Sequence, residues 1–272
     1  MRVAYGADAS QFGDLRLPKG DGPFPVVVVI HGGFWYDRYD LSLMDDVSAD
    51  LTRRGFATWN IEYRRVGDEG GGWPLTLLDT AEAVDYLTVL AGHHPLDLGK
   101  VITLGHSAGG HLALWVAARR RIAELGLAGS EKFLGREDDG SHPLQIHGAV
   151  SLAGVSDLQQ MWQVRQENSP VVDFLGGTPS EVPERYAVAS PDALLPLGLP
   201  QVLVHGTDDD RVPFDISDRY YQKAMELGDT VTLIELPGIE HFKVIQPNSE
   251  AWPTIAAAVE ELFMTIEASA AN

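Results

Sequence analysis

Six short apolar runs, rich in β-branched residues, constrain the fold more than any other feature of the chain. Most are continuous rather than alternating, and they occupy residues 26–30, 56–64, 101–105, 147–154, 201–206 and 231–238. Continuous apolar strands are typical of a parallel sheet that is covered on both faces. The segments between them have helical spacing, at residues 41–55, 74–92, 109–121, 217–228 and 254–268. This alternation predicts a single α/β domain over residues 1–272.

Two stretches interrupt the alternation. Residues 122–146 are mostly polar, and residues 156–199 contain Trp162 and several prolines. The second stretch is long for a connection inside a compact domain, and such insertions often form lids or binding loops. We therefore expect residues 156–199 to form a small cap or a substrate loop.

The charge balance excludes some classes of partner. The chain carries 39 acidic against 20 basic residues, a formal net charge of −19, which would repel a nucleic-acid backbone. No apolar run approaches the roughly 20 residues that cross a bilayer, so we expect no membrane partner. The first residues lack the apolar core of a secretory signal, and a cytoplasmic location is the simplest expectation. Cysteine is absent, which excludes disulfides and a cysteine nucleophile.

One serine lies in an unusual setting. Gly105-His106-Ser107-Ala108-Gly109 follows an apolar strand and opens a helix, which is the context expected for a G-x-S-x-G nucleophile elbow. The sharp turn requires small residues two positions away on either side of the serine. Its hydroxyl would then project above the sheet, with the helix directly behind it. Ser107 is therefore the predicted nucleophile.

A nucleophilic serine needs a base and an acid that orients the base. Both candidates follow Ser107 along the chain, at the ends of predicted strands. His241 lies in a loop after residues 231–238, and three consecutive aspartates follow residues 201–206. We predict His241 as the base and Asp209 as the acid, with Asp208 and Asp210 as rivals for the acid.

The other histidines are weaker candidates for the base. His106 is the neighbour of the nucleophile, and we expect its side chain to point away from Ser107. His31 and His205 border predicted strands, where we expect structural roles.

Backbone amides that can stabilise an oxyanion are predicted after the first apolar strand. That strand ends in His31-Gly32-Gly33-Phe34-Trp35, and glycines there allow N–H groups to turn toward a developing negative charge. Gly33 and Phe34 are the predicted donors, together with Ala108 at the start of the helix after Ser107. Nearby aromatic residues are candidates for the walls of a substrate site, and we predict substrate-binding roles for Trp35, Trp73 and Trp162.

No motif indicates a cofactor or a metal. The glycine-rich residues 67–74 lack the Gly-Lys-Ser/Thr of a phosphate loop, and no H-E-x-x-H spacing is present. We therefore expect neither an organic cofactor nor a metal ion.

The motifs together resemble those of the α/β-hydrolase superfamily. "HGGFW", "GHSAGG", "HGTDDDRVP" and "GIEHF" occur in that family's order, over roughly residues 5 to 265. "HGGFW" resembles a signature of kynurenine formamidases (arylformamidases) and of related small bacterial carboxylesterases. The resemblance implies an α/β-hydrolase fold: a mainly parallel central sheet, helices on both faces and a small cap-like insertion. It also implies Ser107 as nucleophile, His241 as base and the aspartate of Asp-x-x-Val-Pro, here Asp209, as acid.

The expected activity is hydrolysis of small carboxylic esters through an acyl-enzyme intermediate. The first alternative is hydrolysis of the formamide N-formylkynurenine. A second alternative, of another class, is a non-catalytic binding module that has the hydrolase fold. In the first two cases the partner is a small-molecule ester or formamide. The sequence leaves the oligomeric state open, with a homodimer as one option.

Overall fold

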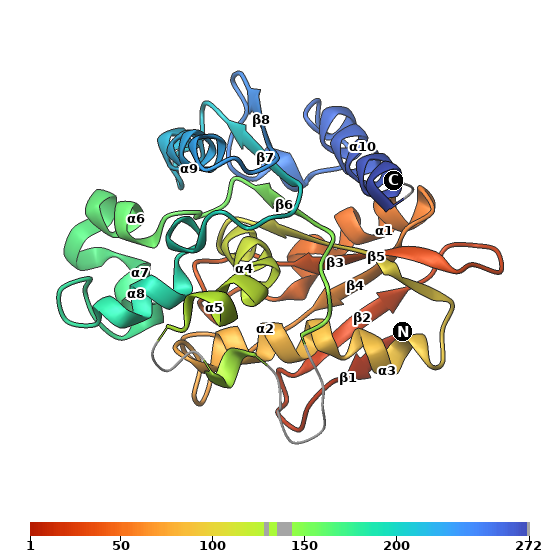
Figure 1. Ribbon diagram of the computed structural model, residues 1–272, viewed down its shortest axis with the longest axis horizontal. Coiled ribbons are helices and arrows are strands. Elements are labelled where there is room, and N and C mark those ends of the chain that lie inside the picture. The colour runs from red at the N-terminus through yellow and green to blue at the C-terminus, as the bar shows by residue number, and fades with distance from the viewer. Residues whose placement is uncertain (128–130, 135–142, 271–272) are drawn as a thin grey trace.

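The computed structural model describes residues 1–127, 131–134 and 143–270, and its strands form one twisted sheet (Figure 1). The strand order is β1-β2-β4-β3-β5-β6-β7-β8. Strands β4, β3, β5, β6, β7 and β8 pair with their neighbours in parallel. The pairings of β1 with β2 and of β2 with β4 are antiparallel. The predicted mainly parallel α/β fold is confirmed. The strands are β1 Arg2–Ala4, β2 Phe12–Arg16, β3 Phe24–Ile30, β4 Ala57–Ile61, β5 Leu96–His106, β6 Gly148–Leu152, β7 Gln201–Gly206 and β8 Val231–Leu236.

Strand β3 shows why the central strands are apolar throughout. Val26, Val28 and Ile30 belong to one hydrophobic core, and Val27 and Val29 belong to a second core. Successive side chains of a strand point to opposite faces of the sheet, so both faces are covered. Burial of both faces of the sheet therefore explains why the apolar run is continuous, as we inferred from the sequence.

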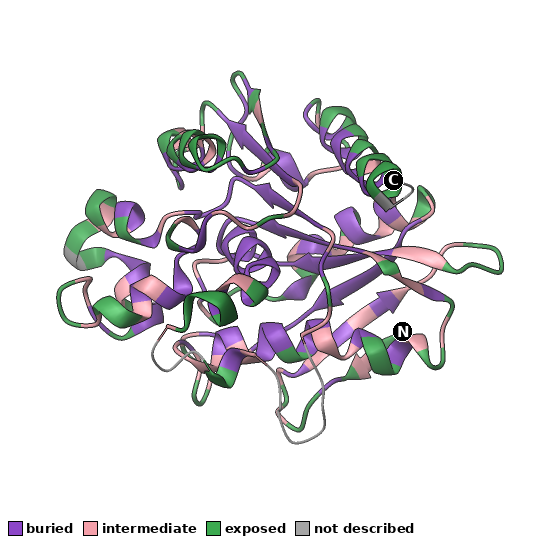
Figure 2. Ribbon diagram, in the orientation of Figure 1, coloured by how far each residue is buried: buried purple, intermediate pink, exposed green. Residues whose placement is uncertain are grey.

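The two cores are covered by different helices. Helices α1 and α10 contribute to one core, and α2, α3, α4, α5 and α9 contribute to the other. Figure 2 shows that the central strands β4, β6 and β7 and helix α4 are buried, whereas the outer helices are exposed on one side. These helices are α1 Asp45–Arg53, α2 Leu75–Asp85, α3 Leu87–Ala91, α4 Ala108–Ala117, α5 Arg119–Leu125, α9 Phe214–Glu226 and α10 Trp252–Ala270.

The structure differs from the sequence-based boundaries in three places. Strands β1 and β2 were not predicted: they are short, and only alternate residues of β2 are buried. The predicted helices 74–92 and 109–121 are each divided in two, at Tyr86 and Ala118. The predicted polar stretch 122–146 lies partly outside the described residues, and residues 131–133 within it form a short 3₁₀ helix, η2.

The insertion between β6 and β7 is largely helical and gathers on one side of the molecule (Figure 1). It contains α6 Leu158–Arg165, η4 Gln166–Asn168, α7 Pro170–Leu175, α8 Pro183–Ala189 and η5 Pro191–Leu194. Helix α4 holds it in place, because Trp115 Nε1 donates to the Val188 carbonyl at 3.0 Å. That residues 1–272 form one domain, with 156–199 as a small cap, remains our proposal.

Among the described residues, no helix is long and apolar enough to cross a membrane. The same residues contain no group of three or more histidine, aspartate or glutamate side chains suited to holding a metal ion.

Candidate active site

Four loops at the carboxyl ends of parallel strands carry the predicted triad and the predicted oxyanion donors Gly33 and Phe34. These loops follow β3, β5, β7 and β8. Because the strands are parallel, these ends lie along the same edge of the sheet, where sites of open α/β folds assemble. The sheet therefore brings together segments that are far apart in the sequence.

Ser107 lies between the end of β5 and the start of α4, in a strained backbone conformation. Its φ is 57° and its ψ is −119°, a region that costs a non-glycine residue about 1–3 kcal/mol. Three backbone hydrogen bonds hold the turn: Ser107 N donates to Leu152 O at 2.9 Å, and Ser107 O accepts from His111 N at 3.1 Å and from Val155 N at 3.3 Å. The surrounding structure thus maintains a conformation that the chain would not adopt by itself.

The glycines on either side of Ser107 are required by close backbone contacts. A Cβ atom at Gly105 would collide with the carbonyl oxygen of Gly109, and one at Gly109 would collide with the carbonyl oxygen of Ile30. The strand and the helix can approach this closely only because both positions lack side chains.

His241 and Asp209 form a buried pair. His241 Nδ1 lies 2.6 Å from Asp209 Oδ2, and both side chains are almost completely buried. A carboxylate only accepts hydrogen bonds, so Nδ1 carries the proton and Nε2 keeps its lone pair. The pair therefore leaves a basic nitrogen on the opposite edge of the imidazole ring.

A second imidazole supports the same carboxylate. His205 Nε2 lies 3.2 Å from Asp209 Oδ2, and the backbone N–H groups of Arg211 and Val212 both donate to Oδ1 at 2.8 Å. Burial acts to raise the pKa of Asp209. The hydrogen bonds from His205 and His241 outweigh that effect, and the pKa lies well below its usual value. Asp209 is therefore ionised at any pH near neutrality.

The rival aspartates lie elsewhere. Asp208 is exposed and accepts a long hydrogen bond from Thr207 Oγ1 at 3.3 Å, and Asp210 is exposed and pairs with Arg211. Of the three consecutive aspartates, Asp209 is the one that the structure brings to His241.

His106 packs against His241, a contact that its position in the sequence did not indicate. Its ring centroid lies 4.5 Å from that of His241, and its Nε2 donates to the His241 carbonyl at 3.0 Å. Burial lowers the pKa of His106 to about 3, so this imidazole is neutral. It holds the loop that carries His241 beside the elbow that carries Ser107.

Ser107 and His241 line one cavity of about 260 Å³, which we call the active-site cavity. Two of the three predicted oxyanion donors, Gly33 and Phe34, line it as well. Walls are added by the loop after β3, by α6 and α7 with the turn between them, and by the loops after β7 and β8. The lining residues are Gly33, Phe34, Tyr36, Arg38, Tyr39, His106, Ser107, Arg165, Asn168, Pro170, Arg211, His241 and Phe242.

The loop after β3 has three consecutive residues with positive φ. The values are 118° at Gly33, 54° at Phe34 and 61° at Trp35. None of the described residues accepts a hydrogen bond from the backbone N–H of Gly33, Phe34 or Ala108. Ala108 is the first residue of α4, where N–H groups have no partner within the helix. These amides are free to bind a ligand oxygen.

Trp35 anchors this loop from the core and is not part of the cavity wall. Its side chain is completely buried and stacks on Phe174 of α7 at a centroid distance of 4.5 Å. Its Nε1 donates to His111 Nδ1 at 3.3 Å. The predicted substrate-binding role of Trp35 is therefore replaced by a structural one.

The start of the same loop is held by a buried polar cluster. His31 Nε2 lies 2.9 Å from Glu62 Oε1, and the His31 ring stacks on Tyr63 at 4.5 Å. Tyr63 in turn donates to the His31 carbonyl at 2.8 Å. His31 has the structural position that we expected, and Glu62 is a partner that the sequence pattern did not indicate.

The other two predicted substrate-binding tryptophans lie outside the active-site cavity. Trp73 packs on Phe133 at a centroid distance of 5.4 Å. Trp162 lines a separate hollow with Gln163, Gln166 and Thr178.

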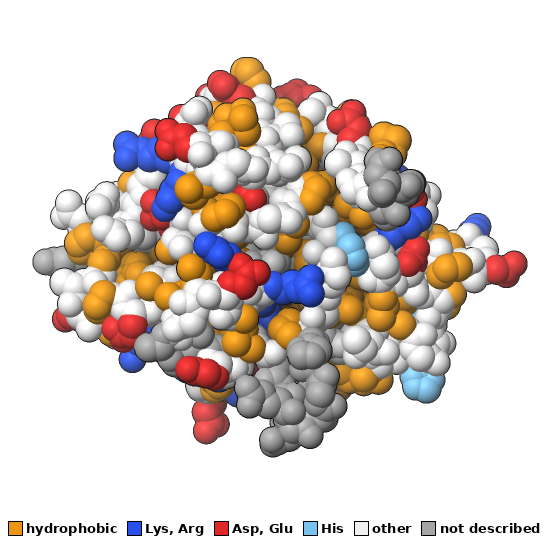
Figure 3. Space-filling model, in the orientation of Figure 1, with side chains coloured by type: hydrophobic (Ala, Val, Ile, Leu, Met, Phe, Trp, Pro, Cys, Tyr) orange, Lys and Arg blue, Asp and Glu red, His pale blue; other side chains and the backbone are white. Residues whose placement is uncertain are grey.

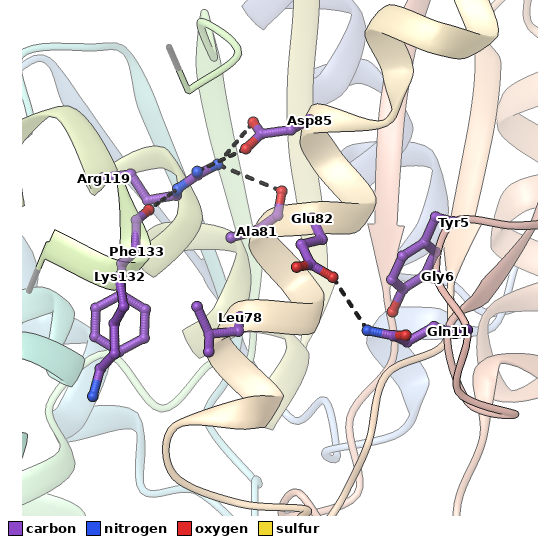
Figure 4. A pocket seen from close by; sticks show the side chains of 11 residues that line it. Tyr5, Gly6, Gln11, Leu78, Ala81, Glu82, Asp85, Arg119, Lys132 and Phe133 are labelled. Carbon is purple, nitrogen blue, oxygen red and sulfur yellow. Dashed lines mark hydrogen bonds and ion pairs between the residues drawn. The ribbon is translucent and has the colours of Figure 1, made fainter. Parts of the chain in front are cut away.

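A larger cavity, which we call the distal cavity, has about 590 Å³ and is lined by residues of α2, α5 and η2 and of the N-terminal loop (Figure 4). Arg119 crosses one side of it. Its guanidinium donates to both oxygens of Asp85 at 2.9 and 2.7 Å and to the Phe133 carbonyl at 2.8 Å.

Curated relatives of the chain carry esterase names. A probable isoprenylcysteine alpha-carbonyl methylesterase of Arabidopsis thaliana is 25% identical over 253 residues, which are 88% of this chain and 50% of that protein. Esterase EstD of Thermotoga maritima is 24% identical over 245 residues, 86% of this chain and 55% of that protein. The chain spans about half the length of these relatives.

Solved structures share the whole fold at low sequence identity. A truncated carbohydrate esterase from gut microbiota superposes with a TM-score of 0.80 at 20% identity, covering 97% of this chain and 95% of that one. A thermophilic esterase of Thermogutta terrifontis with butyrate bound gives 0.77 at 19% identity, covering 98% and 94%. The model of one family, BD-FAE, matches residues 14–224. By that match, which covers most of the sheet together with Ser107 and Asp209, the chain belongs to the BD-FAE family.

Proposed function

We propose that the protein is a serine carboxylesterase that hydrolyses small esters through an acyl-enzyme intermediate. One observation carries the proposal: a serine held on a strained elbow shares a small cavity with a histidine whose Nδ1–H is bound to a buried, ionised aspartate. This combination supplies a nucleophile, a base and the group that orients the base.

In the proposed mechanism, His241 Nε2 accepts the proton of the Ser107 hydroxyl while Ser107 Oγ attacks the ester carbonyl carbon. The N–H groups of Gly33, Phe34 and Ala108 stabilise the oxyanion, and each such donor contributes about 3–4 kcal/mol to lowering the barrier. His241 then gives its proton to the departing alkoxide, and the alcohol leaves. Water repeats the cycle and releases the acid, while the Asp209 carboxylate stabilises the imidazolium that forms in each half.

The relatives support this assignment. The Thermogutta terrifontis esterase has been described with butyrate and with propionate bound, and as phosphorylated by paraoxon. The cavity of the present chain, about 260 Å³, is near the lower end of the range for small-molecule sites. A short acyl chain is the substrate that such a space favours.

The test combines covalent labelling with turnover. A fluorophosphonate probe is expected to label the wild-type protein and p-nitrophenyl butyrate to be hydrolysed. Both signals should vanish in Ser107→Ala, because Ser107 is the one serine or threonine among the described residues that line the cavity. If the folded wild-type protein neither reacts with the probe nor hydrolyses the ester, the chain is a binding module and the proposal fails.

Formamide hydrolysis is the second candidate. A formyl group needs very little acyl space, and the aromatic side chains of Phe34, Tyr36, Tyr39 and Phe242 narrow the cavity around Ser107. Assaying N-formylkynurenine beside p-nitrophenyl butyrate separates the two candidates. A kcat/KM for the formamide above that for the ester would replace carboxylesterase by formamidase.

A further inference from the structure

The charge of the active-site cavity is opposite to that of the molecule. The chain has a formal net charge of −19, and acidic side chains are scattered over the face shown in Figure 3. Among the described residues that line the active-site cavity, three are arginines and none is an aspartate or glutamate. Arg38 comes from the loop after β3, Arg165 from the end of α6, and Arg211 from the loop after β7.

Arg165 is held in place without an acidic partner. Its guanidinium lies 5.4 Å from the centroid of the Phe34 ring and donates one hydrogen bond, at 2.8 Å, to the Arg211 carbonyl. In the described part of the chain no carboxylate lies within ion-pair distance of it. A guanidinium has five N–H donors in a planar fork, so most of its donors remain open to a ligand.

Arg38 repeats this arrangement on another wall. Its guanidinium lies 4.9 Å from the centroid of the Tyr36 ring. No described carboxylate pairs with it, although Asp37 is its neighbour in sequence. The nearby acidic groups are otherwise engaged: Asp173 accepts from the Tyr36 hydroxyl, and Asp210 pairs with Arg211 at 3.3 Å. Two guanidinium groups without an ion-pair partner among the described residues therefore line the cavity.

We propose that this cavity selects esters that carry a carboxylate away from the scissile bond, with Arg38 and Arg165 as the residues that bind it. The inference rests on the proposed esterase function. Planar guanidinium groups match a carboxylate with two parallel hydrogen bonds. The stacking on Phe34 also places Arg165 next to a predicted oxyanion donor, so a carboxylate bound there would lie within a few bonds of the reacting carbon.

The experiment compares matched esters at fixed ionic strength. One pair carries the charge on the acyl side, p-nitrophenyl hydrogen glutarate against its methyl ester. The other carries it on the alcohol side, 4-carboxyphenyl butyrate against 4-(methoxycarbonyl)phenyl butyrate. In at least one pair, kcat/KM for the anionic ester should exceed that for the neutral one by about tenfold or more, as hydrogen bonds to a charged group predict.

Variants assign that preference to the arginines. Arg165→Gln and Arg38→Gln should each reduce the anionic-to-neutral ratio of kcat/KM by about fivefold or more. Arg53→Gln removes the same charge from α1, where the side chain is exposed and pairs with Asp50, and should leave the ratio unchanged. Arg38 is exposed and makes no ion pair among the described residues, so its variant is expected to fold even if Arg165→Gln does not.

The outcomes separate this inference from the esterase proposal. Hydrolysis of the neutral esters with no anionic preference in either pair would overturn the carboxylate site and leave the esterase standing. A preference that survives both arginine variants would overturn their role. If neither neutral nor anionic esters are hydrolysed and the fluorophosphonate does not label Ser107, the esterase proposal itself fails.

Discussion

The distal cavity and the active-site cavity both have arginines in their walls, but these arginines have different partners. In the distal cavity, Arg119 is saturated by Asp85 and by a backbone carbonyl (Figure 4). In the smaller active-site cavity, Arg38 and Arg165 have no carboxylate partner among the described residues, and the backbone N–H groups of Gly33 and Phe34 are unused. Charged side chains that pair with each other hold parts of the fold together. Donors without a partner, on a well-packed fold, are available to a ligand. The active-site cavity is the smaller of the two, so its open hydrogen-bonding groups, and not its volume, distinguish it.

The largest expected effect tests whether the active-site cavity contains a catalytic triad. Asp209→Asn should lower kcat for p-nitrophenyl butyrate by about 10⁴-fold. An amide can donate to His241 Nδ1, and the imidazole would then lose its correct tautomer and the charge that stabilises it. Steady-state kinetics of the purified variant measure the change.

The neighbouring aspartates provide matched controls. Asp208→Asn and Asp210→Asn remove the same charge one residue away and should retain activity close to that of the wild type. If either of them abolishes turnover while Asp209→Asn does not, the assignment of the acid is wrong.

A smaller effect tests whether the distal cavity is structural. Arg119→Met should lower the free energy of unfolding by about 3 kcal/mol, since it leaves Asp85 without its buried partner. The side chain of Arg119 is 3% exposed and that of Asp85 is 29% exposed. Urea denaturation measures the loss, and kcat/KM of the folded variant should not change.

Arg53→Met, at an exposed arginine, is the control for the loss of stability in Arg119→Met. Arg53→Met also removes an ion pair with an aspartate, but its side chain is 67% exposed, and such pairs contribute about 0.5 kcal/mol. A loss of activity in folded Arg119→Met would contradict our separation of the two cavities.

The smallest effect concerns the buried imidazole of His111, which packs against Trp35. Burial lowers the pKa of His111 to about 4, whereas an unfolded histidine titrates near pH 6.5. The contribution of His111 to stability is therefore fully present above about pH 6.5 and is lost as the pH decreases toward 4. In that range the imidazole binds a proton in the unfolded chain but not in the folded protein. Between pH 7.5 and pH 5, His111 should account for about 2 kcal/mol of lost stability.

Denaturation of His111→Gln at the two pH values measures this contribution. The pH-dependent difference should shrink by about that amount, whatever the absolute stability of the variant. His93→Gln, at an exposed position, should leave the difference unchanged. An unaltered pH dependence in His111→Gln would show that its imidazole is not buried in the neutral form.

The sequence predicted the parallel core and the motif residues well, for a physical reason. Strands buried on both faces must be apolar throughout, and an elbow such as Gly105–Gly109 must have glycines at fixed positions, so both leave local patterns. Strands β1 and β2 at the edge of the sheet need no such pattern. The choice of Asp209 among three aspartates followed a local motif, and its contact with His241 is visible only in the fold.

What the sequence could not predict depends on contacts between distant segments. His106 and His241 are 135 residues apart, and Glu62 and His31 are 31 apart. Neither pair has a sequence spacing that would indicate a contact. Trp35 was misinterpreted for the same reason: an aromatic residue beside a site motif can face the ligand or the core, and its stacking on Phe174 of α7 decides between them.

The burial of Trp35 has a consequence for the timing of catalysis. Its indole is locked between α4 and α7 when the protein folds, and the adjoining residues Gly33 and Phe34 are thereby fixed before any substrate arrives. The conformational entropy of ordering these predicted oxyanion donors is then lost when the chain folds, and it is not lost again in each turnover. Because the loop after β3 is already ordered, catalysis should not require this loop to close over the substrate, and turnover should begin without a lag.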